Sequence, residues 1–167
     1  MKIYITNLFD LAEHVRTVQP GYLVSIIQPV FQPETPDEIE PERHLRVEVD
    51  DISAPSLGSI VPERTHIEEL VDFLHEWPAD ESLMVHCYAG VSRSSATALI
   101  AHYMQGSDEF ASAQALRAAA PHASPNRLII SLADEILGCN GRLIEARESM
   151  GLGQPVIEGP LVELDAL

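Results

Sequence analysis

The sequence predicts a single α/β domain, in which a central, mostly parallel sheet of four or five strands is flanked by helices, with extra helices at the C-terminal end. Two observations predict it. Segments with strand-like apolar patterns alternate with segments of helical period in the first half of the chain, and helical patterns alone fill residues 92–150. The length of 167 residues is ordinary for one domain with a real core.

Four segments have the pattern of strands. Residues 1–6 and 44–49 alternate apolar and polar side chains, which is typical of a strand with one buried face. Residues 22–28 (YLVSIIQ) form a compact apolar run rich in branched side chains, and residues 82–86 (SLMVH) form a shorter one. We expect these segments to build the sheet.

Six segments have the pattern of helices. In the segment that follows Pro62, apolar residues recur at spacings of three and four, and proline suits the first turn of a helix. Gly138 suits the position just after a helix. The expected helices are residues 10–17, 62–77, 92–105, 108–119, 125–137 and 141–150.

Two loops and a tail complete the chain. Residues 29–42 hold four prolines and five acidic residues but no basic one, which indicates a solvated loop, and residues 50–62 indicate a second. Residues 151–167 are rich in glycine and proline and hold three acids and no base. We therefore expect the domain to span residues 1–150 and the remainder to be a loosely packed acidic tail.

The chain carries a formal charge of −16, from 26 acidic and 10 basic residues. Such a charge repels nucleic acid and anionic lipid headgroups, so neither is an expected partner. No apolar run approaches the roughly 20 residues that span a bilayer, and the N-terminus lacks the apolar core of a signal peptide. A cytoplasmic location is therefore expected, while the oligomeric state stays open.

Cys87 and Cys139 are the two cysteines. A structural disulfide is unusual in a cytosolic protein, and two thiols without histidines at short spacing do not make a zinc site. The seven histidines are scattered, with no HExxH or comparable pair. We expect no metal and no other cofactor, and we expect Cys139 to be a plain buried cysteine.

The segment from His86 to Ser94 (HCYAGVSRS) carries the chemistry. A strand that ends in Cys87, a short loop with glycine and then a helix can bind an anion, because the loop N–H groups turn inward and the helix N-terminus adds a positive dipole. Arg93 follows five residues after Cys87, and its guanidinium offers two parallel donors to two phosphate oxygens. The dipole and Arg93 also favour a thiolate at Cys87. This local feature would overcome the repulsion of an anion by the acidic surface.

The pattern H-C-x5-R-S resembles the loop of the protein tyrosine phosphatase superfamily, and the variant AGVSRS is similar to its dual-specificity branch. Residues 5–9 (ITNLF) resemble the opening strand and turn of that branch, and residues 123–126 (ASPN) are similar to its late Pro-Asn motif. The resemblance covers roughly residues 1–140 and implies a small cysteine-dependent phosphatase of bacterial type.

The resemblance also implies roles for the residues at matching positions. Cys87 would attack phosphorus and form a phosphocysteine, Arg93 would hold the phosphate oxygens, and Ser94 would steady the thiolate as the leaving group of the second step. His86 would shape the loop and is not expected to act as an acid or base. The expected substrate-binding residues are Tyr88, Ala89, Gly90, Val91, Ser92 and Arg93.

The mechanism further needs a carboxylic acid that protonates the leaving group and then activates water. In the family this aspartate lies on a separate loop after a strand, and residues 49–52 (VDDI) occupy that place here. Asp51 best matches the strand-then-Asp pattern, and Asp50 is the alternative.

The substrate is less well defined than the catalyst. Relatives that act on phosphoinositides or other polyanions often carry lysine in the loop, and residues 88–92 hold none. We expect a phosphorylated protein or a small phosphomonoester, with phosphotyrosine first by the preference of the family and phosphoserine or phosphothreonine as alternatives. Other oxyanion chemistry, of the sulfurtransferase or arsenate-reductase type, and a non-catalytic phosphate-binding module are the competing interpretations.

Overall fold

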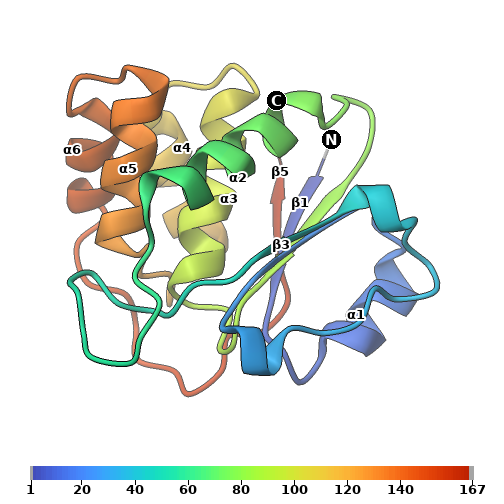
Figure 1. Cartoon of the computed structure of the whole chain (residues 1–167). Coiled ribbons are helices and arrows are strands. Elements are labelled where there is room, and N and C mark those ends of the chain that lie inside the picture. The colour runs from blue at the N-terminus through green and yellow to red at the C-terminus, as the bar shows by residue number, and fades with distance from the viewer. Residues whose placement is uncertain (1, 166–167) are drawn as a thin grey trace.

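A computed structural model describes residues 2–165 of the chain, in which one five-stranded sheet is packed between helices (Figure 1). The strands are β1 (Lys2–Thr6), β2 (Tyr22–Ile26), β3 (His44–Val47), β4 (Leu83–His86) and β5 (Val162–Asp165). The helices are α1 (Leu11–Val18), α2 (Arg64–Glu76), α3 (Arg93–Met104), α4 (Glu109–Ala119), α5 (Arg127–Leu137) and α6 (Arg142–Ser149), with short 3₁₀ turns at Pro29–Phe31 and Pro41–Arg43.

The sheet has the strand order β3-β2-β4-β1-β5. The first four strands in this order run parallel to their neighbours, with Ile5 of β1 opposite Val85 of β4 and Val24 of β2 opposite the same residue. The expected α/β fold with a mostly parallel sheet is therefore confirmed. Since these four strands are parallel, their carboxyl ends meet at one edge, which is where open α/β sheets bind ligands.

The strand β5 corrects the expectation of a loosely packed tail. It pairs antiparallel with β1, and its side chains alternate between buried Val162 and Leu164 and exposed Glu163 and Asp165. Four residues of alternating pattern are enough to cover the free edge of β1, although glycines and prolines surround them. Residues 159–165 are thus an ordered part of the domain.

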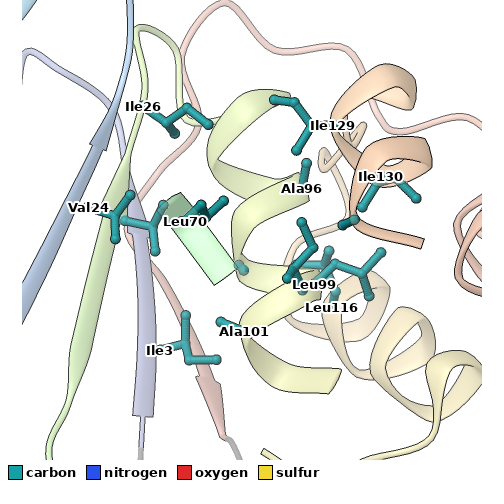
Figure 2. Close-up of a cluster of buried hydrophobic side chains, with 14 of the residues drawn as sticks. Ile3, Val24, Ile26, Leu70, Ala96, Leu99, Ala101, Leu116, Ile129 and Ile130 are labelled. Atoms are coloured by element: carbon teal, nitrogen blue, oxygen red, sulfur yellow. The ribbon is translucent and has the colours of Figure 1, made fainter. Parts of the chain in front are cut away.

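Helices cover both faces of the sheet. The helix α1 lies alone on one face, where Leu11 and Val15 pack with Leu23 and Met84 of the strands, and α2 to α6 gather on the other face (Figure 1). The main core forms between this second face and the helices. Figure 2 shows side chains of β1, β2 and α2 to α5 meeting there, among them Ile3, Val24, Ile26, Leu70, Ala96, Leu99, Ala101, Leu116, Ile129 and Ile130.

The helix α3 is the centre of this layer. Its first ten residues, 93–102, are all buried, because the helix lies between the sheet and the helices α4 and α5. Alanines at positions 96, 98 and 101 allow this close packing on every side. The N-terminus of α3 is therefore held rigidly at the carboxyl edge of the sheet.

The expected elements agree with the observed ones apart from their ends. β2 and β3 each end two residues earlier than expected, and β2 stops before Pro29, which has no N–H to donate. The helix expected from Pro62 begins at Arg64, and Gly138 follows α5 in a left-handed conformation with φ of 69°. Within residues 2–165, no helix has the length and apolar character needed to cross a membrane.

Candidate active site

The loop between β4 and α3, residues 87–92, forms one wall of a pocket at the carboxyl edge of the sheet. The pocket has a volume of about 320 Å³. Residues from three separate segments converge on it, namely those that follow β2, β3 and β4, although they are far apart in the sequence. The lining residues are Gln28, Phe31, Asp51, Cys87, Tyr88, Ala89, Val91, Ser92 and Arg93.

The peptide groups of the loop are oriented by neighbouring segments. The carbonyl of Tyr88 accepts a hydrogen bond from the N–H of Leu8 (3.0 Å), that of Ala89 from Gly159 (2.7 Å), and that of Val91 from Ser124 (2.9 Å). In a trans peptide the carbonyl and the next N–H point in opposite directions. Because these carbonyls face away from the pocket, the N–H groups that follow them face into it and form an anion-binding concavity.

The Cα of Gly90 faces the end of β1 and not the pocket. Its φ is +71°, and a Cβ there would lie 2.9 Å from the backbone oxygen of Thr6. The loop therefore requires glycine at this position, both for the conformation and for the close approach of β1.

Cys87 lies at the base of the pocket, with only 2% of its surface exposed. Its Sγ lies 3.1 Å from the Oγ of Ser94, in the first turn of α3. A hydroxyl donor and a helix N-terminus both stabilise negative charge on sulfur. Ser94 is fully buried and reaches the pocket only through this sulfur.

Arg93 is a buried cation whose hydrogen bonds are incomplete. Its Nη1 donates to Oε1 of Gln28 (2.7 Å) and to the carbonyl of Val49 (2.9 Å). Its Nε is buried and has no hydrogen-bond partner within the part of the chain that the structure describes. Leaving a buried charged donor unsatisfied is costly, and a phosphate oxygen in the adjacent pocket would satisfy it.

The two candidate aspartates differ in position. Asp51 lines the pocket, and its Oδ1 accepts hydrogen bonds from Oγ of Ser92 (2.7 Å) and Nδ2 of Asn126 (2.9 Å). Asp50 instead exchanges hydrogen bonds with Ile60, which closes the loop between β3 and α2. The structure thus brings Asp51 to the cysteine and the arginine.

His86 lies beneath the loop, fully buried, and is neutral. Burial lowers its pKa to about 4, an effect that the nearby charge of Arg93 increases and the carbonyl of Cys87 opposes. Nδ1 of the ring lies 3.1 Å from that carbonyl and donates a hydrogen bond to it. In a neutral ring this leaves Nε2 without hydrogen, so Nε2 accepts a hydrogen bond from Oγ of Ser25 at 2.7 Å. The hydroxyl of Ser25 also forms a hydrogen bond with Nε2 of His44. Burial lowers the pKa of His44 to about 4 as well.

Aromatic side chains form the outer part of the pocket. Phe31 and Tyr88 both line it, and the Tyr88 ring packs edge-to-face against Phe31 (5.1 Å between centroids) and Phe9 (5.2 Å). Between 38% and 56% of each residue is exposed. Exposed aromatic rings in mutual contact at the mouth of a pocket are a typical recognition surface.

The sequence interpretation assigned no role to Gln28, Phe31, Phe9 or Asn126. Asn126 belongs to the Pro-Asn motif, and the resemblance pointed to it without giving it a function. Gln28 carried one weak signal, since it is a polar residue at the end of an apolar run. Phe9 and Phe31 lie outside the main helices and strands, and the contact of each with Tyr88 depends on the tertiary fold.

The second cysteine lies outside this site. Cys139 is a free, buried thiol just after α5, and burial raises its pKa. From residue 2 to residue 165, no group of three or more His, Cys, Asp or Glu side chains could hold a metal ion.

Comparisons with known proteins identify the fold. Of protein-family models none matches the sequence, and none of the curated proteins matches it either. Solved structures do match. The chain is similar to DUSP15, with 23% identity over 89% of each chain and a TM-score of 0.59. It is also similar to human DUSP28, with 22% identity, 83% of this chain and 89% of that chain covered, and a TM-score of 0.59.

A third similar structure is PTPMT1 in complex with PI(5)P, with 17% identity, 89% of this chain and 91% of that chain covered, and a TM-score of 0.56. These alignments extend over nearly the whole length of each protein. The chain therefore has the same fold as these dual-specificity-phosphatase structures.

Proposed function

We propose that this protein is a phosphatase that hydrolyses phosphate monoesters through a phosphocysteine intermediate. The observation that carries the proposal is the pairing of a buried thiol with a buried, unsatisfied Nε of Arg93 in one pocket of suitable size. A nucleophile and an unpaired cation at the N-terminus of a helix match the needs of phosphoryl transfer.

In the first step the Cys87 thiolate attacks phosphorus. The S–P bond forms, the bond between phosphorus and the ester oxygen breaks, and Asp51 gives its proton to the departing oxygen. Arg93 and the inward N–H groups of the loop bind the equatorial phosphate oxygens in the transition state. Inorganic phosphate has not yet formed, and the alcohol or phenol leaves.

In the second step water attacks the phosphocysteine. Asp51, now a carboxylate, takes a proton from the water, the P–O bond forms and the S–P bond breaks. Cys87 leaves as a thiolate, which the Ser94 hydroxyl stabilises from 3.1 Å. The products are inorganic phosphate and the original enzyme.

Asp51 is our proposed acid and base because of its contacts. Ser92 and Asn126 both donate to Oδ1, so they hold the carboxyl group over the pocket, and Oδ2 is the oxygen left to exchange a proton with substrate. Asp50 is an unsuitable candidate, since its carboxylate binds the backbone of its own loop.

We propose phosphotyrosine, in a phosphorylated protein, as the preferred substrate. The aromatic rings of Phe31 and Tyr88, which line the pocket, support this choice, because edge-to-face contacts would bind an aryl ring but add little for a short alkyl chain. The solved PTPMT1 structure contains PI(5)P. The absence of lysine from residues 88–92 here, together with the charge of −16, argues against such a polyanionic substrate.

A panel of substrates tests the proposal. Phosphotyrosine, phosphoserine and phosphothreonine peptides, a phosphoinositide in vesicles and a small aryl phosphate are assayed for phosphate release, and thiosulfate and arsenate are assayed alongside. We expect the aryl phosphates to give the highest kcat/KM and the Cys87→Ser variant to give no turnover. Turnover of thiosulfate or arsenate without phosphate release would contradict the proposed reaction.

A further inference from the structure

Gln28 is the side chain that holds the guanidinium of Arg93 in place. It follows the buried Ile27 and precedes the 3₁₀ turn Pro29–Phe31, and its own carbonyl accepts the N–H of Phe31 at 3.0 Å. The turn that brings Phe31 to the pocket therefore also fixes the backbone of Gln28. Its side chain lines the pocket beside Cys87 and Arg93.

The contacts of Arg93 Nη1 are complete. This nitrogen carries two N–H groups, and its two acceptors are Oε1 of Gln28 at 2.7 Å and the carbonyl of Val49 at 2.9 Å. Two acceptors on one nitrogen fix the plane of the guanidinium and prevent its rotation. The unsatisfied Nε lies on another edge of the same rigid plane, so an anion finds its donor already oriented.

Both acceptors are neutral. The ion pairs of residues 2–165 involve Lys2, Arg43, Arg64 and Arg142, and Arg93 takes part in none of them. A carboxylate in place of the amide of Gln28 could accept the same hydrogen bond, but it would cancel the charge of Arg93 at the point where the phosphate binds. In a protein with a net charge of −16, this local positive charge adds a full formal charge to the attraction that the loop N–H groups and the N-terminus of α3 offer an anion.

We propose that Gln28 is a positioning residue that orients Arg93 without neutralising it, and that the neutrality of its amide determines the affinity of the pocket for a phosphate dianion. The inference deepens the proposed phosphatase function and rests on it for the identity of the anion.

Two substitutions separate charge from structure. Gln28→Glu keeps the size and the acceptor oxygen but adds a negative charge, whereas Gln28→Met keeps the approximate size and removes the hydrogen bond. If Gln28 acts only as a structural support, the methionine variant should bind phosphate worst. If its neutrality matters, the glutamate variant should bind worst although it retains the bond.

The experiment measures the Kd of inorganic phosphate by titration calorimetry, together with the thermal stability of each variant. We expect Gln28→Glu to weaken phosphate binding by at least about tenfold and Gln28→Met by less, because an added charge acts on the dianion directly. Gln114→Glu adds the same charge on the exposed face of α4, away from the pocket, and should leave the affinity unchanged within about twofold. We also expect Gln28→Glu to unfold at a temperature no lower than that of Gln28→Met.

Binding is measured without turnover, so the two proposals can fail separately. Wild-type protein that binds phosphate with this order of variants but hydrolyses no phosphomonoester would retain the inference and overturn the proposed function. Two results would overturn the inference while the wild-type protein is active. In one, Gln28→Glu binds phosphate as tightly as the wild-type protein; in the other, Gln28→Met is the weakest binder.

Discussion

The two cysteines of this chain have almost equal burial but different access to a pocket. Cys87 is 2% exposed and Cys139 is 4% exposed. Cys87 precedes α3, so it lies at the positive end of a helix, with Ser94, Arg93 and a pocket beside it. Cys139 lies between the C-terminus of α5 and the N-terminus of α6, and it does not line that pocket.

The neighbours of Cys139 act on its pKa in both directions, and burial is the largest effect. Burial raises the pKa of this thiol and the acidic groups Asp134 and Glu109 add to the effect, while the hydroxyl of Tyr103 opposes it. A buried cysteine is therefore inert by default. Access to an anion-binding pocket at the N-terminus of a helix makes a buried cysteine suitable as a nucleophile.

Replacing each cysteine by serine should give the largest difference in turnover between the two sites. We expect Cys87→Ser to abolish turnover, because a hydroxyl is a far poorer nucleophile than a thiolate at neutral pH, and to retain phosphate binding. Cys139→Ser should keep kcat within about twofold of the wild-type value, since it touches no group of the pocket. Steady-state assays on an aryl phosphate and phosphate titrations measure both effects. Appreciable turnover by Cys87→Ser would refute the role of the thiolate.

The two neighbouring aspartates sharpen the contrast between a group in the pocket and one outside it. Asp51→Asn should lower kcat by about 10²–10⁴-fold for a substrate with a poor leaving group, because it removes the proton donor. Asp50→Asn should lower kcat by less than about tenfold, since its carboxylate only closes its own loop. Measurements with leaving groups of graded acidity check this, and the opposite ranking of the two variants would move the acid by one residue.

Substitutions at two glycines test whether activity depends on the shape of the loop that follows Cys87. Gly90 and Gly106 both have positive φ, but a Cβ at Gly90 would lie 2.9 Å from Thr6 O whereas one at Gly106 meets nothing within 4 Å. Gly90→Ala should lower kcat/KM by about tenfold or more and destabilise the fold by about 1–3 kcal/mol. Gly106→Ala should cost about 1 kcal/mol in stability and leave kcat/KM unchanged. Equal kinetics for both variants would show that the loop tolerates the displacement.

The buried imidazole of His86 should have a smaller effect, which is a pH dependence of the free energy of unfolding. The pKa of His86 is about 4 in the folded protein, lowered mainly by burial, and about 6.5 in the unfolded chain. Between these values the unfolded chain binds more protons, so the free energy of unfolding should fall as the pH falls from 6.5 towards 4 and should not change from this source above 6.5. The slope is at most about 1.4 kcal/mol per pH unit for this residue.

Urea unfolding at pH 7, 6 and 5 measures that slope. We expect His86→Gln to have a shallower pH dependence than wild-type protein, because the substituted side chain cannot titrate. His44 contributes in the same direction in both proteins, since burial lowers its pKa to about 4 as well. An equal slope in the two proteins would mean that His86 is not held neutral by burial.

Most of the fold could be predicted from the sequence because its elements have clear periods. The buried run from Tyr22 and the helical spacing around Leu70 reflect local patterns, and both predictions are confirmed. The tail was predicted wrongly for a physical reason. β5 is four residues long, and it is stabilised by pairing with β1 about 160 residues away, which no local pattern of glycine and proline can show.

The residues of the candidate site also divide into those that a local pattern predicts and those that only the tertiary fold brings together. Cys87, Arg93 and Ser94 belong to one continuous segment, so a motif could identify them. Gln28 and Phe31 come from a loop that is rich in proline and acidic residues, and they reach the pocket only because β2 lies next to β4. Their contribution depends on strand order, which the sequence alone did not specify.

Trapping the phosphocysteine tests the central claim most directly. In Asp51→Asn, an aryl phosphate with a good leaving group needs no acid in the first step, while the second step lacks its base, so the intermediate should accumulate. The reaction is quenched with acid within the first turnover and the peptides are analysed by mass spectrometry. We predict one phosphoryl group on the peptide that contains Cys87 and none on the peptide that contains Cys139. Phosphate release by this variant without any phosphoryl group on Cys87 would contradict the account.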